Sequence, residues 1–295
     1  MPDSRGKGVM ETFFLSLFIL VVVATAALWA WRRADHAADE AAMARLAALQ
    51  PAAPERFELS LLEGLPEPAQ RYFRYTIQPG TPLHTVARIA MTGKFGMGNR
   101  DAPDYMNMQA TQLLAMPEGF IWKMSAHRGL LGISGSDTDQ WTRFWLMGLF
   151  PVARAGGDAD HARSAFGRYV AEAVFWTPAA LLPGPGVSWK LVDINTARVI
   201  VRHEGMEQAV DVVVADDGRP LQVSFDRWTN ANAEKVHRLQ PFGGYLSEFR
   251  EFEGFVLPTH VEAGNFFATE DYFPFFIARV TDIEFPKHGA IGHPE

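Results

Sequence analysis

The chain has 295 residues, of which 48% are hydrophobic and 21% are charged, a balance that is typical of a globular protein and excludes a disordered one. It contains no cysteine, which excludes disulfides, thiolate metal sites and a cysteine nucleophile. The formal net charge is -7 and no long basic run occurs, so we expect no nucleic-acid partner.

The first recognisable element is an uncharged apolar stretch, FFLSLFILVVVATAALWAW, at residues 13–31. As a helix it is about 28 Å long, close to the roughly 30 Å hydrocarbon core of a bilayer. Trp29 and Trp31 lie at one end, where interfacial aromatic residues are typical, and Arg32 and Arg33 follow directly. The sequence therefore predicts a single-pass membrane anchor whose partner is the lipid bilayer.

A cleaved signal peptide is the alternative interpretation, because Ala24-Thr25-Ala26 resembles a cleavage site. The apolar stretch is longer than the apolar region of such a signal, so a retained anchor over residues 1–33 is favoured. The basic residues on its two flanks nearly balance. The positive-inside rule is therefore close to a tie and leans slightly toward a cytoplasmic body.

Two helical segments are expected next. The alanine-rich residues 34–50 predict a helix that Pro51 ends, and we expect residues 34–62 to form a helical linker. A second, short helix is expected in LPEPAQRYFRYT, residues 65–76, where the prolines suit a first turn.

From about residue 83 the pattern is that of β-strands. Alternating segments are separated by turn signals such as Pro117-Glu118-Gly119 and Asp216-Asp217-Gly218. Strands spaced about ten residues apart predict an antiparallel meander, interrupted by one helical insertion at residues 160–182. The period of DQWTRFWLMGLFPV, residues 139–152, is mixed, and a strand and a short helix both remain open.

The expected fold class is α+β. An N-terminal transmembrane helix precedes one curved antiparallel β-sheet, half-barrel-like, wrapped on the inserted helix, because an apolar sheet face must be covered. We expect this domain to span residues 63–286 and residues 287–295 to form a flexible tail.

Two resemblances bear on this fold. RYVAEAV at residues 168–174, followed by WTPAALLP at residues 176–183, resembles the signature of an uncharacterised bacterial family, domain of unknown function 6544. The order Phe175-Trp176 reverses the usual Trp-Phe, and the resemblance implies no established activity. The similarity runs from Leu65-Pro66 to the final strands.

The second resemblance is one of style. Residues 217–223 and 254–259 are similar to the strand–turn–strand units of lipoprotein-carrier (Lol-type) half-barrels, envelope proteins that hold acyl chains in an apolar concavity. This resemblance implies a periplasmic body, tethered to a bacterial inner membrane, with an apolar or acyl ligand.

The candidate ligand-binding residues lie on and around the inserted helix: Trp122, Arg168, Tyr169, Glu172, Trp176, Leu181 and Trp189. Arg168 and Glu172 are four residues apart and can pair. A pair on the helix surface is favoured, and a buried pair guarding an apolar cleft is the alternative. The tryptophans suit either the wall of such a cleft or a core without a void.

No motif predicts chemistry. P-loop, GxGxxG, HExxH and GxSxG patterns are absent, so no catalytic residue and no cofactor are predicted. The pairs His260/Glu262 and Asp137/Asp139 share a strand face but lack a third ligand, so no metal site is predicted either.

Three functions remain open. The first is a membrane-tethered protein that binds or carries an apolar or acyl ligand. The second is an envelope enzyme such as a hydrolase that uses Glu172, His127 or Asp193. The third is an envelope assembly or interaction protein, which an exposed apolar patch would favour.

Overall fold

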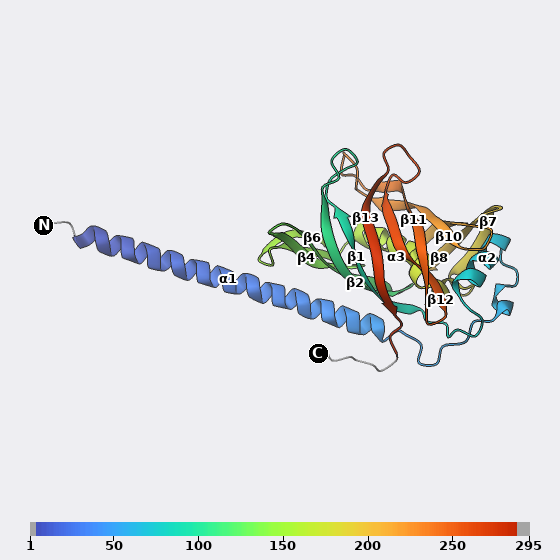
Figure 1. The fold of residues 1–295 in the computed structure, drawn as a ribbon. Coiled ribbons are helices and arrows are strands. Elements are labelled where there is room, and N and C mark those ends of the chain that lie inside the picture. Colours follow the sequence, from blue (N-terminus) through green and yellow to red (C-terminus); the bar gives the residue numbers. More distant parts are fainter. Residues whose placement is uncertain (1–3, 288–295) are drawn as a thin grey trace.

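The structure is a computed structural model that describes residues 4–287. A long N-terminal helix extends away from a body in which one curved sheet wraps a second helix (Figure 1). The expected tail at residues 287–295 lies outside the described residues except for Lys287.

The elements follow one another along the chain with few long connections. The helices and single 3-10 turns are α1 (Ser4–Ala47), η1 (Leu59–Leu62), α2 (Glu67–Thr76), α3 (Ala159–Trp176) and η2 (Pro178–Leu181). The strands are β1 (Val86–Gly96), β2 (Tyr105–Ala115), β3 (Gly119–Arg128), β4 (Leu131–Thr138), β5 (Trp141–Leu146), β6 (Phe150–Gly156), β7 (Val187–Asp193), β8 (Thr196–His203), β9 (Met206–Val214), β10 (Pro220–Thr229), β11 (Arg238–Phe252), β12 (Phe255–Asn265) and β13 (Phe273–Glu284).

The described strands form one antiparallel sheet, in the order β6-β5-β4-β3-β2-β1-β13-β12-β11-β10-β9-β8-β7. Strands that are consecutive in the sequence pair with each other, except β6 and β7. The remaining pair joins β1 to β13. The sheet is unclosed, with edges β6 and β7, and α3 connects these two edges. The predicted α+β fold with a curved antiparallel sheet is confirmed.

The segment with the mixed period, residues 139–152, forms the hairpin β5–β6. Its alternation is hard to see in the sequence because large apolar side chains lie on both faces of β5. Trp145 is buried and contacts α1, whereas its neighbour Phe144 points into the concave side of the sheet.

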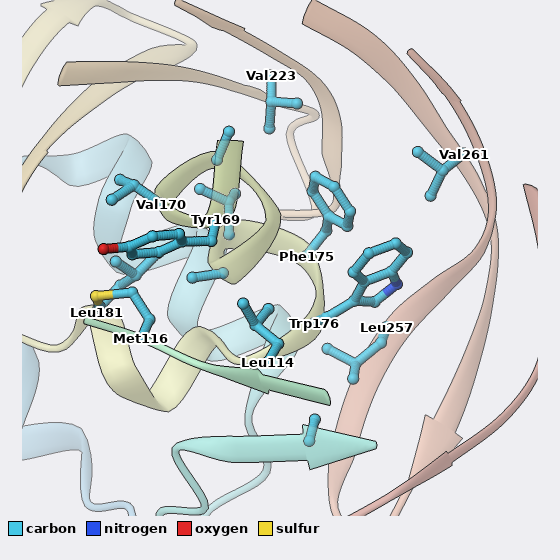
Figure 2. Close-up of a cluster of buried hydrophobic side chains, with 14 of the residues drawn as sticks. Leu114, Met116, Tyr169, Val170, Phe175, Trp176, Leu181, Val223, Leu257 and Val261 are labelled. Atoms are coloured by element: carbon cyan, nitrogen blue, oxygen red, sulfur yellow. The ribbon is translucent and has the colours of Figure 1, made fainter. Parts of the chain in front are cut away.

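Helix α3 covers the concave face of the sheet. Asp158 caps its first turn by accepting a hydrogen bond from the backbone N–H of His161 at 2.8 Å, and Pro178 follows its end. In Figure 2, Phe175 and Trp176 point from α3 toward the strands that carry Val223 and Val261, and Tyr169 points the other way. The helix therefore packs through two of its sides, and the side with Phe175 and Trp176 borders the candidate site.

Helix α1 runs without a break through the apolar stretch and the first part of the expected helical linker, and it ends at Ala47. The apolar window near its N-terminus is long enough to cross a membrane and is not buried in the protein. Asp35, Asp39, Met43 and Leu46, spaced three or four residues apart, are buried against the outer face of the sheet. Residues 34–47 thus belong to the packed body and hold α1 in a fixed direction.

Asp35 makes the strongest contact between α1 and the sheet. Arg154 donates two hydrogen bonds to its carboxylate, both at 2.7 Å, and Trp145 Nε1 donates a third at 2.9 Å. Asp39, which lies four residues after Asp35 on α1, accepts a hydrogen bond from Ser136 at 2.7 Å. Bidentate arginine pairs fix geometry as well as adding energy, so α1 cannot swing freely.

Helix α2 covers the other end of the sheet. Arg71 donates hydrogen bonds to the carbonyl oxygens of Ala215 at 2.9 Å and Ile194 at 2.6 Å. The predicted Asp-Gly turn between β9 and β10 packs against the same residue, because a Cβ on Gly218 would come within 2.2 Å of the Arg71 carbonyl oxygen.

We expect Gly218→Ala to destabilise the protein more than Gly205→Ala. Both glycines have positive φ, +90° and +79°, but only Gly218 has a neighbour in the way. The backbone strain alone should cost Gly205→Ala about 1 kcal/mol, and the clash should bring Gly218→Ala to roughly 2–4 kcal/mol. Urea unfolding in detergent measures both, and equal losses would contradict the contact with α2.

Candidate functional site

A cavity of about 210 Å³ lies between α3 and the concave face of the sheet. Its wall is mostly aromatic and comes from α3 and from strands on both sides of the β1–β13 junction: Phe95, Trp122, Phe144, Phe175, Trp176, Phe225, Phe242, Phe275 and Phe276. An apolar cavity with a few polar groups is the usual form of a small-molecule site.

A larger cavity of about 420 Å³ lies on the opposite face, between α1 and the sheet. Asp35 in its lining forms ion pairs with Arg143 at 3.5 Å and with Arg154 at 2.7 Å, and Asp39 accepts a hydrogen bond from Ser136. Because these contacts hold α1 to the sheet, we regard the inner cavity as the candidate functional site.

Arg168 is the centre of a buried polar network at the inner cavity. Its Nε donates a hydrogen bond to Glu172 at 2.7 Å, and its Nη1 donates one to Asp137 on β4 at 2.6 Å. Gln112 on β2 donates to the other oxygen of Glu172 at 2.5 Å, and Thr142 donates to Asp137. The pair predicted from the helical spacing is therefore the buried alternative and not a surface pair.

The surroundings of Arg168 keep it charged. Desolvation by itself lowers the pKa of its guanidinium, but the carboxylates of Glu172 and Asp137 outweigh that effect, so the pKa is raised above its usual value. The guanidinium also lies over the rings of Phe120 and Trp122, at 4.5 and 5.2 Å. Arg168 is thus fully engaged by the protein and ties α3 to β4.

Arg227 on β10 is the second arginine of the cavity lining and has no such partners. Its Nε–H is buried and donates to no hydrogen-bond acceptor among residues 4–287, although the guanidinium lies 5.0 Å from the Phe242 ring centroid. Burial, together with the nearby charge of Arg168, lowers its pKa to about 10. It is therefore a cation at neutral pH, without an ion-pair partner in the described part of the chain.

Two further donors at the cavity are unsatisfied. The indole N–H groups of Trp122 and Trp176 are both buried and, within the described residues, neither has a hydrogen-bond acceptor. Buried polar groups are nearly always paired, and each exception calls for a physical explanation. The unsatisfied groups that line this cavity are all donors, which suits a ligand that brings acceptors.

The structure brings four of the predicted site residues together at the cavity: Trp122, Arg168, Glu172 and Trp176. The other three lie outside its lining. Tyr169 packs on the opposite side of α3 and donates a hydrogen bond to the Pro117 carbonyl at 3.1 Å. Trp189 donates one to the Leu181 carbonyl at 2.9 Å.

Trp189 and Leu181 are part of the hydrophobic core. Trp189 packs against Tyr72 and Phe73 of α2, with ring centroids 5.6 and 5.4 Å apart. Leu181 is completely buried in the same hydrophobic cluster. Their proximity in sequence to Trp176 did not place them at the cavity, because the chain turns away after Pro178.

Sequence reasoning missed Arg227 as a site residue, although the sequence carries a signal for it. Val223, Phe225 and Arg227 alternate along β10 and therefore point to one face of the sheet, and all three line the cavity. A charged residue that continues an apolar face of a strand is unusual. Asp137, considered only as a metal ligand, was also missed as the partner of Arg168.

The residues considered for hydrolysis do not form a constellation. His127 is exposed on β3, Asp193 is exposed at the end of β7, and Glu172 is engaged by Arg168 and Gln112. No group of three or more metal-ligating side chains occurs within the described residues. His260 and Glu262 do share a face, with Nε2 and Oε1 3.8 Å apart.

Comparison with protein families finds a match to the family of unknown function DUF6544 over residues 55–277. The match includes the signature at residues 168–183 and confirms that resemblance. Comparison with curated proteins finds no match.

Two solved structures illustrate the likeness in fold. A LolA superfamily protein, NE2245, from Nitrosomonas europaea has a TM-score of 0.38 and 11% identity, over 74% of this chain and 91% of its own. A domain from Vibrio parahaemolyticus, described as an outer membrane lipoprotein-sorting protein, has a TM-score of 0.36 and 13% identity, over 80% and 94%. At these scores the likeness does not bear on function.

We expect Arg168→Met to destabilise the protein by about 3–5 kcal/mol at neutral pH, because it strands two buried carboxylates without their cation. Denaturant unfolding at neutral pH measures this loss.

The triple variant Arg168→Met, Asp137→Asn and Glu172→Gln is the matched control and should recover most of the lost stability, because none of these three side chains then carries a buried charge. Arg198→Met removes the exposed pair with Asp211 and should cost about 1 kcal/mol or less. A loss of that small size for Arg168→Met would contradict the buried network.

Proposed function

Because the chain belongs to DUF6544, a family of unknown function, we propose a function from the site: the protein is a membrane-anchored binding protein for an acyl chain or a similar apolar ligand. The observation that carries this proposal is the apolar cavity between α3 and the sheet, whose unsatisfied polar groups are all donors. Such a cavity supplies an apolar wall for a tail and polar contacts for one end of it.

The size of the cavity limits the ligand. At about 30 Å³ for each water-sized group, a volume of 210 Å³ holds about seven such groups. That matches a medium-length chain such as octanoate, and a longer chain would extend beyond the cavity as described.

The donors favour a ligand with an anionic end. Arg168 and Glu172, which the sequence offered as a pair guarding the cleft, are already bonded to each other and to Asp137 and Gln112. Arg227 carries a charge and an Nε–H donor without an acceptor among the described residues. A carboxylate or phosphate oxygen would pair with the charge and accept that hydrogen bond. The headgroup therefore belongs at Arg227.

We expect the full chain in detergent to bind octanoate, and Arg227→Gln to weaken that binding about 10- to 150-fold, because a charged hydrogen bond contributes roughly 1.5–3 kcal/mol. Binding of octanol, which has the same tail and no charge, should change little. Titration calorimetry measures both ligands.

Two variants serve as controls. Arg198→Gln removes an arginine from an exposed pair and should leave both affinities unchanged. Ala171→Leu fills part of the cavity and should weaken octanoate and octanol alike. If neither ligand binds the unaltered protein, the proposed function is wrong, whereas equal binding of both ligands to Arg227→Gln overturns only the headgroup assignment.

We also propose that α1 is retained as a single-pass anchor in a bacterial inner membrane, with the body on the periplasmic side. None of the apolar window of α1 is buried in the described part of the protein, unlike the core helix of a soluble domain. The packing of residues 34–47 onto the sheet also favours retention, because cleavage near residue 27 would leave a short, exposed helical end bearing Trp29 and Trp31.

Protease treatment of spheroplasts, followed by mass analysis of the membrane fraction, tests the anchor and the orientation together. We expect the body to be digested and a membrane fragment containing residues 13–31 to remain. A protected full-length mass would place the body in the cytoplasm. An untreated protein whose mass begins near residue 27 would show that the segment is a cleaved signal.

A further inference from the structure

Large apolar side chains are exposed at one end of the sheet. Leu130 is 95% exposed, Leu131 49%, Met147 61%, Phe150 52% and Val152 52%. These five residues, which we call the apolar tip, lie on the β3–β4 and β5–β6 hairpins. Single exposed apolar residues are ordinary on a protein surface, but a group of them marks a contact with something else.

The five residues are close together in space because the two hairpins are neighbours in the sheet. The backbone N–H of Met147 donates a hydrogen bond to the carbonyl of Gly132 at 2.6 Å, which joins the two hairpin ends. Phe150 lies opposite Leu146 across the β5–β6 turn. Phe150 and Val152 are both exposed near the start of β6, where the pairing with β5 shifts register.

Contacts with α1 place the apolar tip beside the end of the apolar stretch. Trp31 packs edge-on against Trp145 on β5, with centroids 5.6 Å apart, and Arg32 donates a hydrogen bond to Ser134 on β4 at 3.1 Å. The β5–β6 turn touches α1 as well, because a Cβ on Gly148 would lie 2.5 Å from Arg32 Nη1. In Figure 1 the hairpins of β4 and β6 extend along α1 toward its N-terminal half.

The direction of α1 is fixed as well as its contacts. Asp35, held by Arg154, and Asp39, held by Ser136, keep the helix against the sheet immediately after the apolar stretch. A helix rises 1.5 Å per residue, so Arg32 lies only a few ångströms beyond the last apolar residue. A bilayer that surrounds residues 13–31 therefore has its surface at the level of the apolar tip.

We propose that the apolar tip inserts into the interface of the same bilayer that holds α1, so that the body is attached to the membrane at two places. The inference rests on the proposed anchor and adds to it a second, peripheral contact. Insertion of apolar side chains into the headgroup region is the way interfacial segments bind membranes. Arg33, stacked on Trp29 at 5.0 Å, supplies the cation that typically borders such a contact.

The lipid surface also accounts for the exposed edge of the sheet. β6 is an edge strand, and an edge with exposed apolar side chains invites pairing with another chain. Contact with the bilayer covers that edge. It further fixes which way the concave sheet faces relative to the lipid from which an acyl ligand would come.

The absence of cysteine in the chain permits a direct test by single labelling. Leu130→Cys and Phe150→Cys, each in the full chain, carry an environment-sensitive fluorophore in phosphatidylcholine vesicles that contain a spin-labelled quencher lipid. Ile194→Cys is the matched control, because Ile194 is an 81% exposed apolar residue at the β7–β8 turn. We expect blue-shifted emission and quenching by the lipid at both tip positions, and neither at position 194.

Each outcome decides the inference. Flotation with the vesicles while the tip labels behave like the control keeps the anchor and overturns the inserted tip. A blue shift that appears only after a membrane protein extract is added overturns it in favour of a protein-binding edge. A full chain that does not float with vesicles overturns both the tip and the anchor, and leaves the octanoate measurements to decide ligand binding separately.

Discussion

The structure depends on the way in which α3 is held inside an open sheet. Arg168 joins the helix to β4 through Asp137, and Gln112 joins Glu172 of the helix to β2, while the apolar side of α3 packs on the opposite part of the sheet. An unclosed sheet of this length would otherwise expose its concave face, which is costly in water. The same contact leaves a gap between helix and strands, and that gap is the candidate site.

The unsatisfied donors give the site its character. A buried donor without an acceptor costs about 1–3 kcal/mol, and Trp122, Trp176 and Arg227 all contribute such a group to one cavity. A ligand that supplies acceptors recovers that free energy on binding, so the empty protein is less stable than the occupied one. Stability given up at a site is common where a protein binds something.

Helix α1 joins the apolar stretch to the body through one rigid element. The helix that carries the apolar stretch also lies on the outer face of the sheet whose inner face bears the cavity. The orientation of the body is therefore decided by side-chain contacts such as Asp35 with Arg154, and not by a flexible linker. In the proposed anchored state, a body held in this way would present a constant face to the lipid.

The sequence by itself determined the features that local periodicity records: the apolar helix, the alternating strands, the inserted helix ended by Pro178, and the signature at residues 168–183. Only the tertiary structure decided which side chains meet. β1 pairs with β13, although the two strands are far apart in the sequence, and α3 packs against the concave face of the curved sheet. Arg168 therefore bonds to Asp137, whereas the Nε–H of Arg227 has no acceptor among the described residues. Tyr169, Leu181 and Trp189, equally plausible in the sequence, turn into the core. Spacing along a helix or strand fixes the face on which a residue lies, but the partner on that face comes from residues that the curvature of the sheet brings near.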